Sequence, residues 1–279
     1  MKPTDDGRTP GTTRILRRLV SRELSTAVAR KSYAVLCLGV VVVLLFLAWS
    51  GGGIGAGYVS TIIALLTPLE LLVPILAMAF GYRAILSDER RGELDVLETY
   101  PVTSWQIVLG VYAGRAIGLA TTTATALLFV MLGVAVSGTQ RSVVYATHTG
   151  TDAPGLYLRF VVLTLLFALV LLAVAIAVSA LVSTTRTAVA AAGFALVVVL
   201  FGADVILLFG LDRGIIAESS LLESLVLSPL SAYRGLVLET SITATSGTGP
   251  RAGSPIASVS GLLMWGIGSL AIATAAVRR

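Results

Sequence analysis

Residues 160–185 read FVVLTLLFALVLLAVAIAVSALVSTT, a run that contains no Asp, Glu, Lys or Arg. A helix needs about 20 predominantly apolar residues to cross the hydrocarbon core of a bilayer, which is about 30 Å thick. This run exceeds that length. It therefore predicts a membrane-spanning helix.

The composition of the whole 279-residue chain agrees with this interpretation. Hydrophobic residues make up 56% of the chain, charged residues only 13%, and the mean hydropathy is +0.93. Soluble globular domains carry about 25% charged residues. The composition therefore excludes the water-soluble classes of protein and predicts an integral membrane protein.

Other charge-poor stretches predict five further crossings. The longest, 32–69, is divided in two by the glycine-rich turn at 50–57, because clustered glycines interrupt helices. The runs lack the apolar and polar alternation of membrane barrel strands. The predicted fold is an all-α membrane protein with six transmembrane helices, over residues 33–50, 59–81, 105–137, 157–183, 187–210 and 257–277.

Positive charges are concentrated on one side of these helices. Loops rich in Lys and Arg tend to stay in the cytoplasm, and an even number of crossings puts both termini on one side. The richer side contains residues 1–31, 82–104, 184–186 and 278–279. The pattern predicts a multi-pass cell-membrane protein with cytoplasmic N- and C-termini, and it explains the net charge of +5 without a nucleic-acid partner.

Residues 1–32 precede the predicted six-helix domain, 33–279, as a basic segment. Between 12 and 31, apolar residues recur at helical spacing with arginines between them. Such a helix lies in the membrane interface with its apolar face inward. We expect an interfacial helix here, although a basic tail that only sets the topology explains the same residues. A further helix is expected over 218–240, in the last outer loop.

The most highly charged loop lies between the second and third crossings. Residues 87–104 read SDERRGELDVLETYPVTS. Leu94, Val96 and Leu97 can form one apolar edge, which predicts a short amphipathic helix on the membrane surface. Pro101 ends it, because proline disfavours the helical conformation in the preceding residue and lacks an N–H.

This loop resembles that of a known family, the permease subunits of ABC-2 type ABC transporters. The family pattern is a charged run of ERxxG type, a Leu-rich element and then Pro-(Val/Ile)-(Ser/Thr). This chain has the similar run ERRGEL at 89–94, then Leu97, then PVT at 101–103. Residues 228–234, SPLSAYR, are similar to an Asn-Pro-x-x-Ala-(Tyr/Phe)-Arg stretch. That stretch is found in the branch of permeases that serves nitrous-oxide-reductase maturation. The likeness in hydropathy extends over nearly the whole chain.

The resemblance implies a six-helix half-transporter, an exporter of a prokaryotic plasma membrane. It also implies a homodimer or a pair with a related permease, and two cytoplasmic ABC ATPase subunits docked on the loop between the second and third helices. ATP and Mg²⁺ would then be bound by the partner ATPase, and this chain would bind no cofactor and catalyse no reaction. The branch further implies a role in copper-enzyme maturation.

The residues themselves exclude ATP binding through a P-loop, which needs a lysine directly after a glycine. Lys2 and Lys31 are the only lysines, and neither follows a glycine. Energy from ATP must therefore arrive through a protein contact. The predicted ATPase-coupling residues are Ser87, Asp88, Glu89, Arg90, Arg91, Gly92, Glu93, Leu94, Leu97 and Pro101. A solvated loop that only satisfies the positive-inside rule would carry the same charges.

Glu70, Asp204 and Arg115 fall inside predicted crossings, where a charge is costly and marks a candidate functional site. Glu70 lies between Pro68 and Pro74, which can loosen the helix and expose backbone carbonyls. Glu70 and Asp204 are the candidates for a substrate pathway. Arg115 is expected to extend toward the cytoplasmic surface in a packing role.

Gly110 and Gly114 lie four residues apart and predict close helix packing, within one chain or between two. No metal site is expected, because Cys37, His148 and the methionines are scattered. The alternative function is an ion-coupled secondary transporter that works without an ATPase, in which Glu70 would take part in ion coupling. A membrane scaffold is a third alternative. Dependence on a partner ATPase separates the first two.

Overall fold

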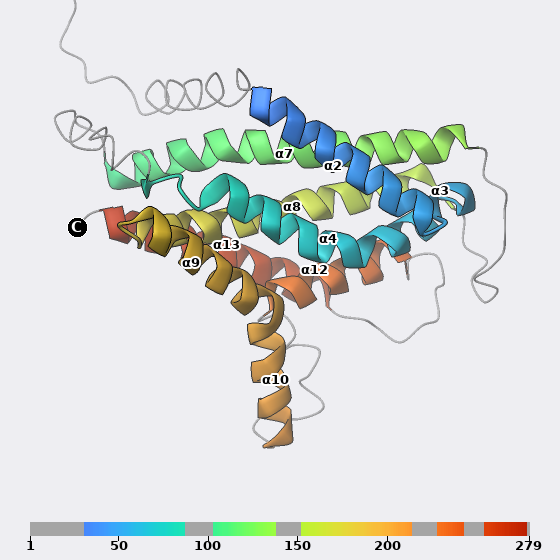
Figure 1. Ribbon diagram of the computed structural model, residues 1–279. Helices are drawn as coiled ribbons and strands as arrows, with labels where there is room; N and C mark the ends of the chain where they lie inside the picture. Colours follow the sequence, from blue (N-terminus) through green and yellow to red (C-terminus); the bar gives the residue numbers. More distant parts are fainter. Residues whose placement is uncertain (1–30, 87–102, 138–151, 214–227, 243–253, 278–279) are drawn as a thin grey trace, which may run out of the picture.

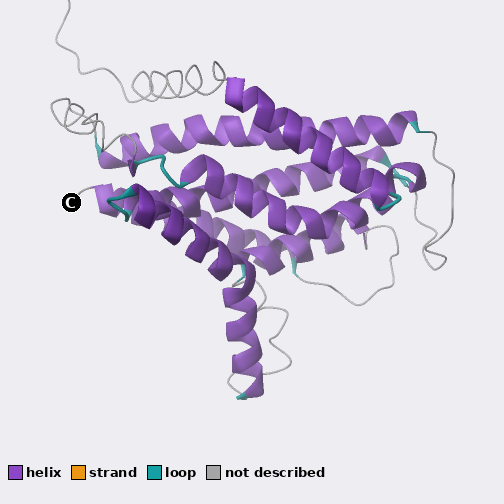
Figure 2. Ribbon diagram, in the orientation of Figure 1, coloured by secondary structure: helices purple, strands orange, loops and turns teal. Residues whose placement is uncertain are grey.

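The computed structural model describes residues 31–86, 103–137, 152–213, 228–242 and 254–277. These residues form helices joined by turns, with no strand among them (Figure 2). Six spans are long and apolar enough to cross a membrane: Tyr33–Ser50, Tyr58–Gly81, Ser104–Val136, Pro154–Ala180, Thr185–Gly202 and Pro255–Val277. The prediction of an all-α membrane protein with six transmembrane helices is therefore confirmed.

The long helices run alternately up and down through one bundle (Figure 1). Their bounds are α2 (Lys31–Ser50), α3 (Gly53–Ala56), α4 (Tyr58–Gly81), α7 (Ser104–Val136), α8 (Pro154–Ala180), α9 (Thr185–Val197), α10 (Ala203–Asp212), α12 (Pro229–Val237) and α13 (Pro255–Val277). Two π-helical turns, η1 (Val198–Gly202) and η4 (Leu238–Ile242), follow α9 and α12.

Helix α8 is the centre of the bundle. It contacts α4, α7, α9, α12 and α13, and it is the most thoroughly buried of the six spans. Its sequence explains this position, because apolar residues surround the helix on all sides instead of forming one stripe. The helix begins at Pro154, three residues before the predicted start, since proline suits the first turn of a helix.

The fifth predicted crossing, 187–210, is not one straight helix. Helix α9 runs into the π turn η1, after which α10 points away from the bundle (Figure 1). Single π turns inside α-helices are a recognised cause of sharp kinks, because the extra residue disrupts the regular hydrogen-bond ladder. The membrane span accordingly ends at Gly202, and α10 lies beyond it.

The predicted glycine turn at 50–57 connects α2 to α4, and a residue from a distant part of the chain binds the start of α4 directly after it. Asp152, just before α8, accepts hydrogen bonds from the backbone N–H groups of Tyr58 and Val59, both at 2.9 Å. The carboxylate thus caps the start of α4, where N–H groups lack helical partners and negative charge is favourable. Gly57 has φ 113°, and a Cβ there would collide with the Asp152 carboxylate.

We expect Asp152→Ala to lower the free energy of unfolding by about 1 kcal/mol, the usual effect of losing a helix cap. SDS-induced unfolding in mixed micelles measures this loss. Asp212→Ala, which removes an exposed aspartate at the end of α10, is the matched control and should leave stability unchanged. Equal effects of the two substitutions would contradict the capping role.

Candidate functional site

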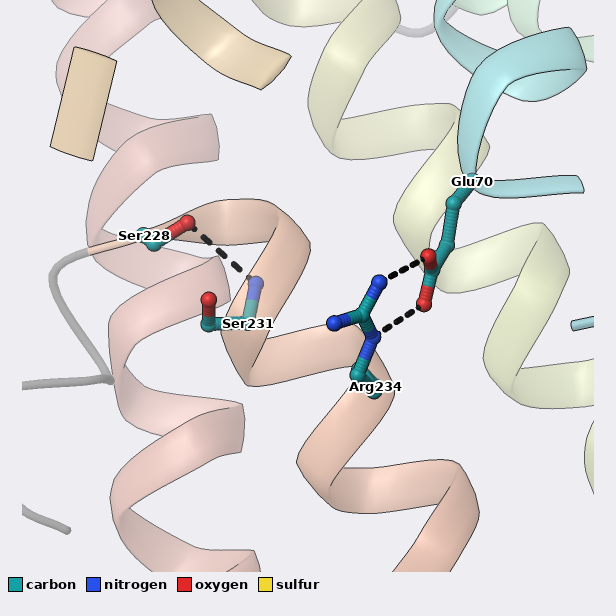
Figure 3. A network of polar contacts seen from close by, with 4 residues as sticks. All are labelled: Glu70, Ser228, Ser231 and Arg234. Carbon is teal, nitrogen blue, oxygen red and sulfur yellow. Dashed lines mark hydrogen bonds and ion pairs between the residues drawn. The ribbon is translucent and has the colours of Figure 1, made fainter. Parts of the chain in front are cut away.

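Glu70 of α4 and Arg234 of α12 form an ion pair (Figure 3). The Nε of Arg234 donates to Oε1 of Glu70 at 2.6 Å, and Nη2 of Arg234 donates to Oε2. Two parallel bonds between a guanidinium and a carboxylate fix the orientation of both groups. The Glu70 side chain is 6% exposed and that of Arg234 is 51% exposed, so the buried member of the pair is the carboxylate.

The sequence of α4 makes the position of Glu70 unusual. Glu70 lies close to the middle of a 24-residue helix, and Pro68 and Pro74 both stand inside that helix. Since proline has no N–H, residue 74 cannot donate the usual helical hydrogen bond to the carbonyl of Glu70. A carboxylate and a weakened backbone ladder therefore meet at one level of the helix, where polar groups are expensive in a membrane.

Helix α12 is the element that brings a cation to this level. It starts at Pro229, and the Ser228 hydroxyl caps it by accepting from the N–H of Ser231 at 3.2 Å (Figure 3). Leu230, Ala232, Tyr233, Leu236 and Val237 are buried. A helix of nine residues that buries so much of its surface packs inside the fold instead of lying on it.

Tyr233 fixes α12 against the centre of α8. Its ring stacks on that of Phe167, with centroids 4.5 Å apart and an interplanar angle of 5°. Its hydroxyl is 2.9 Å from the hydroxyl of Thr164. Thr164 lies about 15 Å along α8 from its first residue, at 1.5 Å per residue. Tyr233 and Arg234, adjacent in sequence, thus tie α12 to α8 and to α4 respectively.

The ion pair connects α4 to α12. Arginine keeps its charge at any physiological pH, so the cation that faces Glu70 is permanent. Each charge alone would be strongly unfavourable in an apolar interior, whereas the pair with two hydrogen bonds is tolerated. Separation of α4 from α12 therefore requires another polar partner for Glu70.

The structure does not unite the residues predicted from sequence into one site. The predicted ATPase-coupling residues, within 87–101, lie outside the described residues, as do residues 12–30 of the predicted interfacial helix. Of the helix predicted over 218–240, residues 218–227 also lie outside, while 229–240 are helical and belong to α12 and η4. Asp204 belongs to α10, which follows the π turn η1, whereas Glu70 belongs to α4. Its assignment to a pathway stays a prediction.

Two predicted packing features lie within α7. Gly110 and Gly114 are both buried. The Nη1 of Arg115 donates to the carbonyl of Phe80 at 3.3 Å, in the last turn of α4. Cations near a helix C-terminus are favourable, because the final carbonyls lack helical partners there.

Comparison with known proteins places the chain in a family. The model of the ABC-2 family transporter protein matches residues 55–278. The chain belongs to this family. It is 30% identical over 248 residues to a Pseudomonas aeruginosa protein named "Probable ABC transporter permease protein NosY", which covers 84% of this chain and 86% of that protein. A Stutzerimonas stutzeri protein of the same name is 30% identical over 107 residues, or 37% of this chain and 39% of that protein.

Membership of the ABC-2 family confirms the resemblance drawn from the charged loop and from residues 228–234. With the six apolar spans, it makes this protein a multi-pass membrane permease subunit of an ABC transporter. The match begins at residue 55, so it includes α4, α12 and the ion pair between them.

Sequence reasoning on this permease missed Arg234 as a site residue. The sequence places Arg234 in the last outer loop, within the motif at 228–234, and predicts no partner for Glu70. The signal that could have found the pair is energetic. A carboxylate predicted at mid-membrane depth requires a cation, and the arginine of a partly apolar helical stretch next to the last crossing is a suitable one.

We expect Arg234→Ala to lower the free energy of unfolding of the permease by about 3 kcal/mol, because it leaves the buried Glu70 carboxylate without this cation. Glu70→Gln should have a smaller effect, since the half-exposed Arg234 is less dependent on its partner. The double variant should recover part of the loss seen in Arg234→Ala.

SDS-induced unfolding of the three variants forms a double-mutant cycle that measures the coupling between the two side chains. Arg186→Ala, at an exposed arginine of α9, controls for the general loss of a positive charge. If Arg234→Ala were no more destabilising than Arg186→Ala, the pair would have no structural importance.

Proposed function

We propose that this permease is the membrane-spanning half of an ATP-driven exporter in a prokaryotic plasma membrane, with both termini cytoplasmic. A second copy or a related permease completes the pathway, and two cytoplasmic ABC ATPase subunits bind ATP and Mg²⁺ and supply the energy. The observation that carries the proposal is the family match over residues 55–278. Likeness to the nitrous-oxide-reductase branch extends the proposal to maturation of a copper enzyme.

The ATPase contact in this proposal is the charged segment between α4 and α7. These helices end and begin, respectively, at the same end of the bundle, so residues 87–102 connect them there (Figure 1). Asp88, Glu89, Arg90, Arg91 and Glu93 pair with complementary charges on the ATPase. Closure of the ATPases around ATP moves the segment, and the helices shift between two access states.

Glu70 takes part in the pathway in this proposal. Its support is a position near the middle of a span, two prolines in the same helix and a charge partner on a different element. Opening of a path between α4 and α12 would change the surroundings of this ion pair, because Glu70 belongs to α4 and Arg234 belongs to α12. Asp204 is proposed as a second pathway residue, just beyond the end of the fifth span.

The first test is purification of the permease from its native membrane in mild detergent. An ABC ATPase should co-purify in stoichiometric amount, and reversal of charge in the double variant Glu89→Arg and Arg91→Glu should release it. The matched control reverses an adjacent exposed pair at the end of α10, with Asp212→Arg and Arg213→Asp, and should retain the ATPase.

Two results would contradict this proposal. A permease that purifies alone and catalyses ion-dependent flux in liposomes would overturn the proposed exporter in favour of a secondary transporter. Retention of both the ATPase and its activity in the Glu89 and Arg91 variant would reject the charged segment as the coupling surface.

A further inference from the structure

The chain that leaves α4 is fastened to the end of α8. The Oγ of Ser179, one residue before the end of α8, accepts hydrogen bonds from the N–H of Ile85 at 3.0 Å and of Leu86 at 3.2 Å. Ser179 is completely buried. One side-chain oxygen thus satisfies two backbone donors that lie after the last turn of α4.

Close packing strengthens this connection. A Cβ placed on Gly81 would lie 2.5 Å from the Cβ of Ala175, so α4 and α8 approach each other as closely as glycine allows. Ala84, Ile85 and Leu86 are each at most 2% exposed. The last described residues before 87–102 are therefore held in the core, and densely packed interiors transmit displacement instead of absorbing it.

The middle of α8 holds α12. Thr164 and Phe167 contact Tyr233, and they precede Ser179 by 15 and 12 residues, about 22 and 18 Å along the helix axis. Tyr233 is followed by Arg234, which binds Glu70. A single helix therefore contacts, near its end, the residues that immediately precede the predicted coupling segment and, near its middle, the element that carries Arg234 of the ion pair.

We propose that Ser179 is a positioning residue that makes α8 move together with Ile85 and Leu86, the residues that lead into the 87–102 segment. This inference rests on the proposed function, in which an ATPase displaces that segment. With Ser179 present, the displacement is passed along α8 to α12 and to the Glu70–Arg234 pair. Without it, the N–H groups of Ile85 and Leu86 must find other acceptors, and the end of α4 moves without α8.

The test measures movement at the far end of the bundle in the complex co-purified with its ATPase. Cys37→Ser removes the only cysteine of the chain. Spin labels are then placed at Val136→Cys and Ile256→Cys, which are 78% and 84% exposed. They lie at the end of α7 and the start of α13, and these two helix ends are at the opposite end of the bundle from the end of α8 (Figure 1). Helix α13 contacts α12 and so follows its movement.

Pulsed electron paramagnetic resonance compares the label distances without nucleotide and after trapping with ATP and vanadate. We expect a shift in the parent complex and its loss in Ser179→Ala, with ATPase binding and ATP hydrolysis retained. A merely structural serine would not separate these readouts. Ser269→Ala, at a buried serine of α13, is the matched control and should keep the shift.

Four outcomes overturn the inference, the last of them together with the proposed function. An ATPase-bound Ser179→Ala complex with the full shift overturns it alone, as does a parent complex that binds ATPase and shows no shift. A loss of the shift in both Ser179→Ala and Ser269→Ala would attribute the effect to any buried serine and not to Ser179. Purification without an ATPase overturns the proposed function, and this inference with it.

Discussion

The burial of one carboxylate in an apolar helix bundle is the constraint on which the centre of this structure depends. Glu70 lies near the middle of α4, and a charge at that depth requires a partner. Arg234 supplies it only because α12 enters the bundle, and α12 stays there because Tyr233 stacks on Phe167 and bonds Thr164. The ion pair thus holds α12 against α4, and the contacts of Tyr233 hold α12 against α8.

The remaining polar contacts between helices follow the same logic. Lipid is as apolar as the side chains of the helices, so helices associate in a membrane through close packing and hydrogen bonds. At the interface of α2 and α7, the Tyr33 hydroxyl donates to the carbonyl of Gly118 at 3.0 Å, and Cys37 lies 3.2 Å from the hydroxyl of Thr122. Small residues permit the approach, and single hydroxyls specify the register.

These contacts also divide the bundle into a firmly connected part and a looser one. Helices α4, α7 and α8 pack closely, and Ser179 and Arg115 hold the end of α4. The described side chains of α9, η1 and α10 are mostly exposed or half-buried, with Phe194, Phe201 and Phe209 at the surface. In a permease, a connected core suits the transmission of force, whereas exposed apolar helices suit contact with lipid or with another subunit.

The sequence by itself determined the number of crossings, their approximate limits and the family. Hydrophobic length is a local property, because any 20-residue apolar run must satisfy its backbone polar groups as a helix in lipid. The motifs that indicated the ABC-2 family are local as well. Tertiary structure alone decided the partners: Arg234 for Glu70, 164 residues away, Ser179 for Ile85, and Asp152 for Tyr58, each 94 residues away. The kink after α9 is also a property of the tertiary structure. Such features cannot be read from a local stretch of sequence, because side chains far apart in sequence meet only after the helices have packed, and packing depends on all neighbours together.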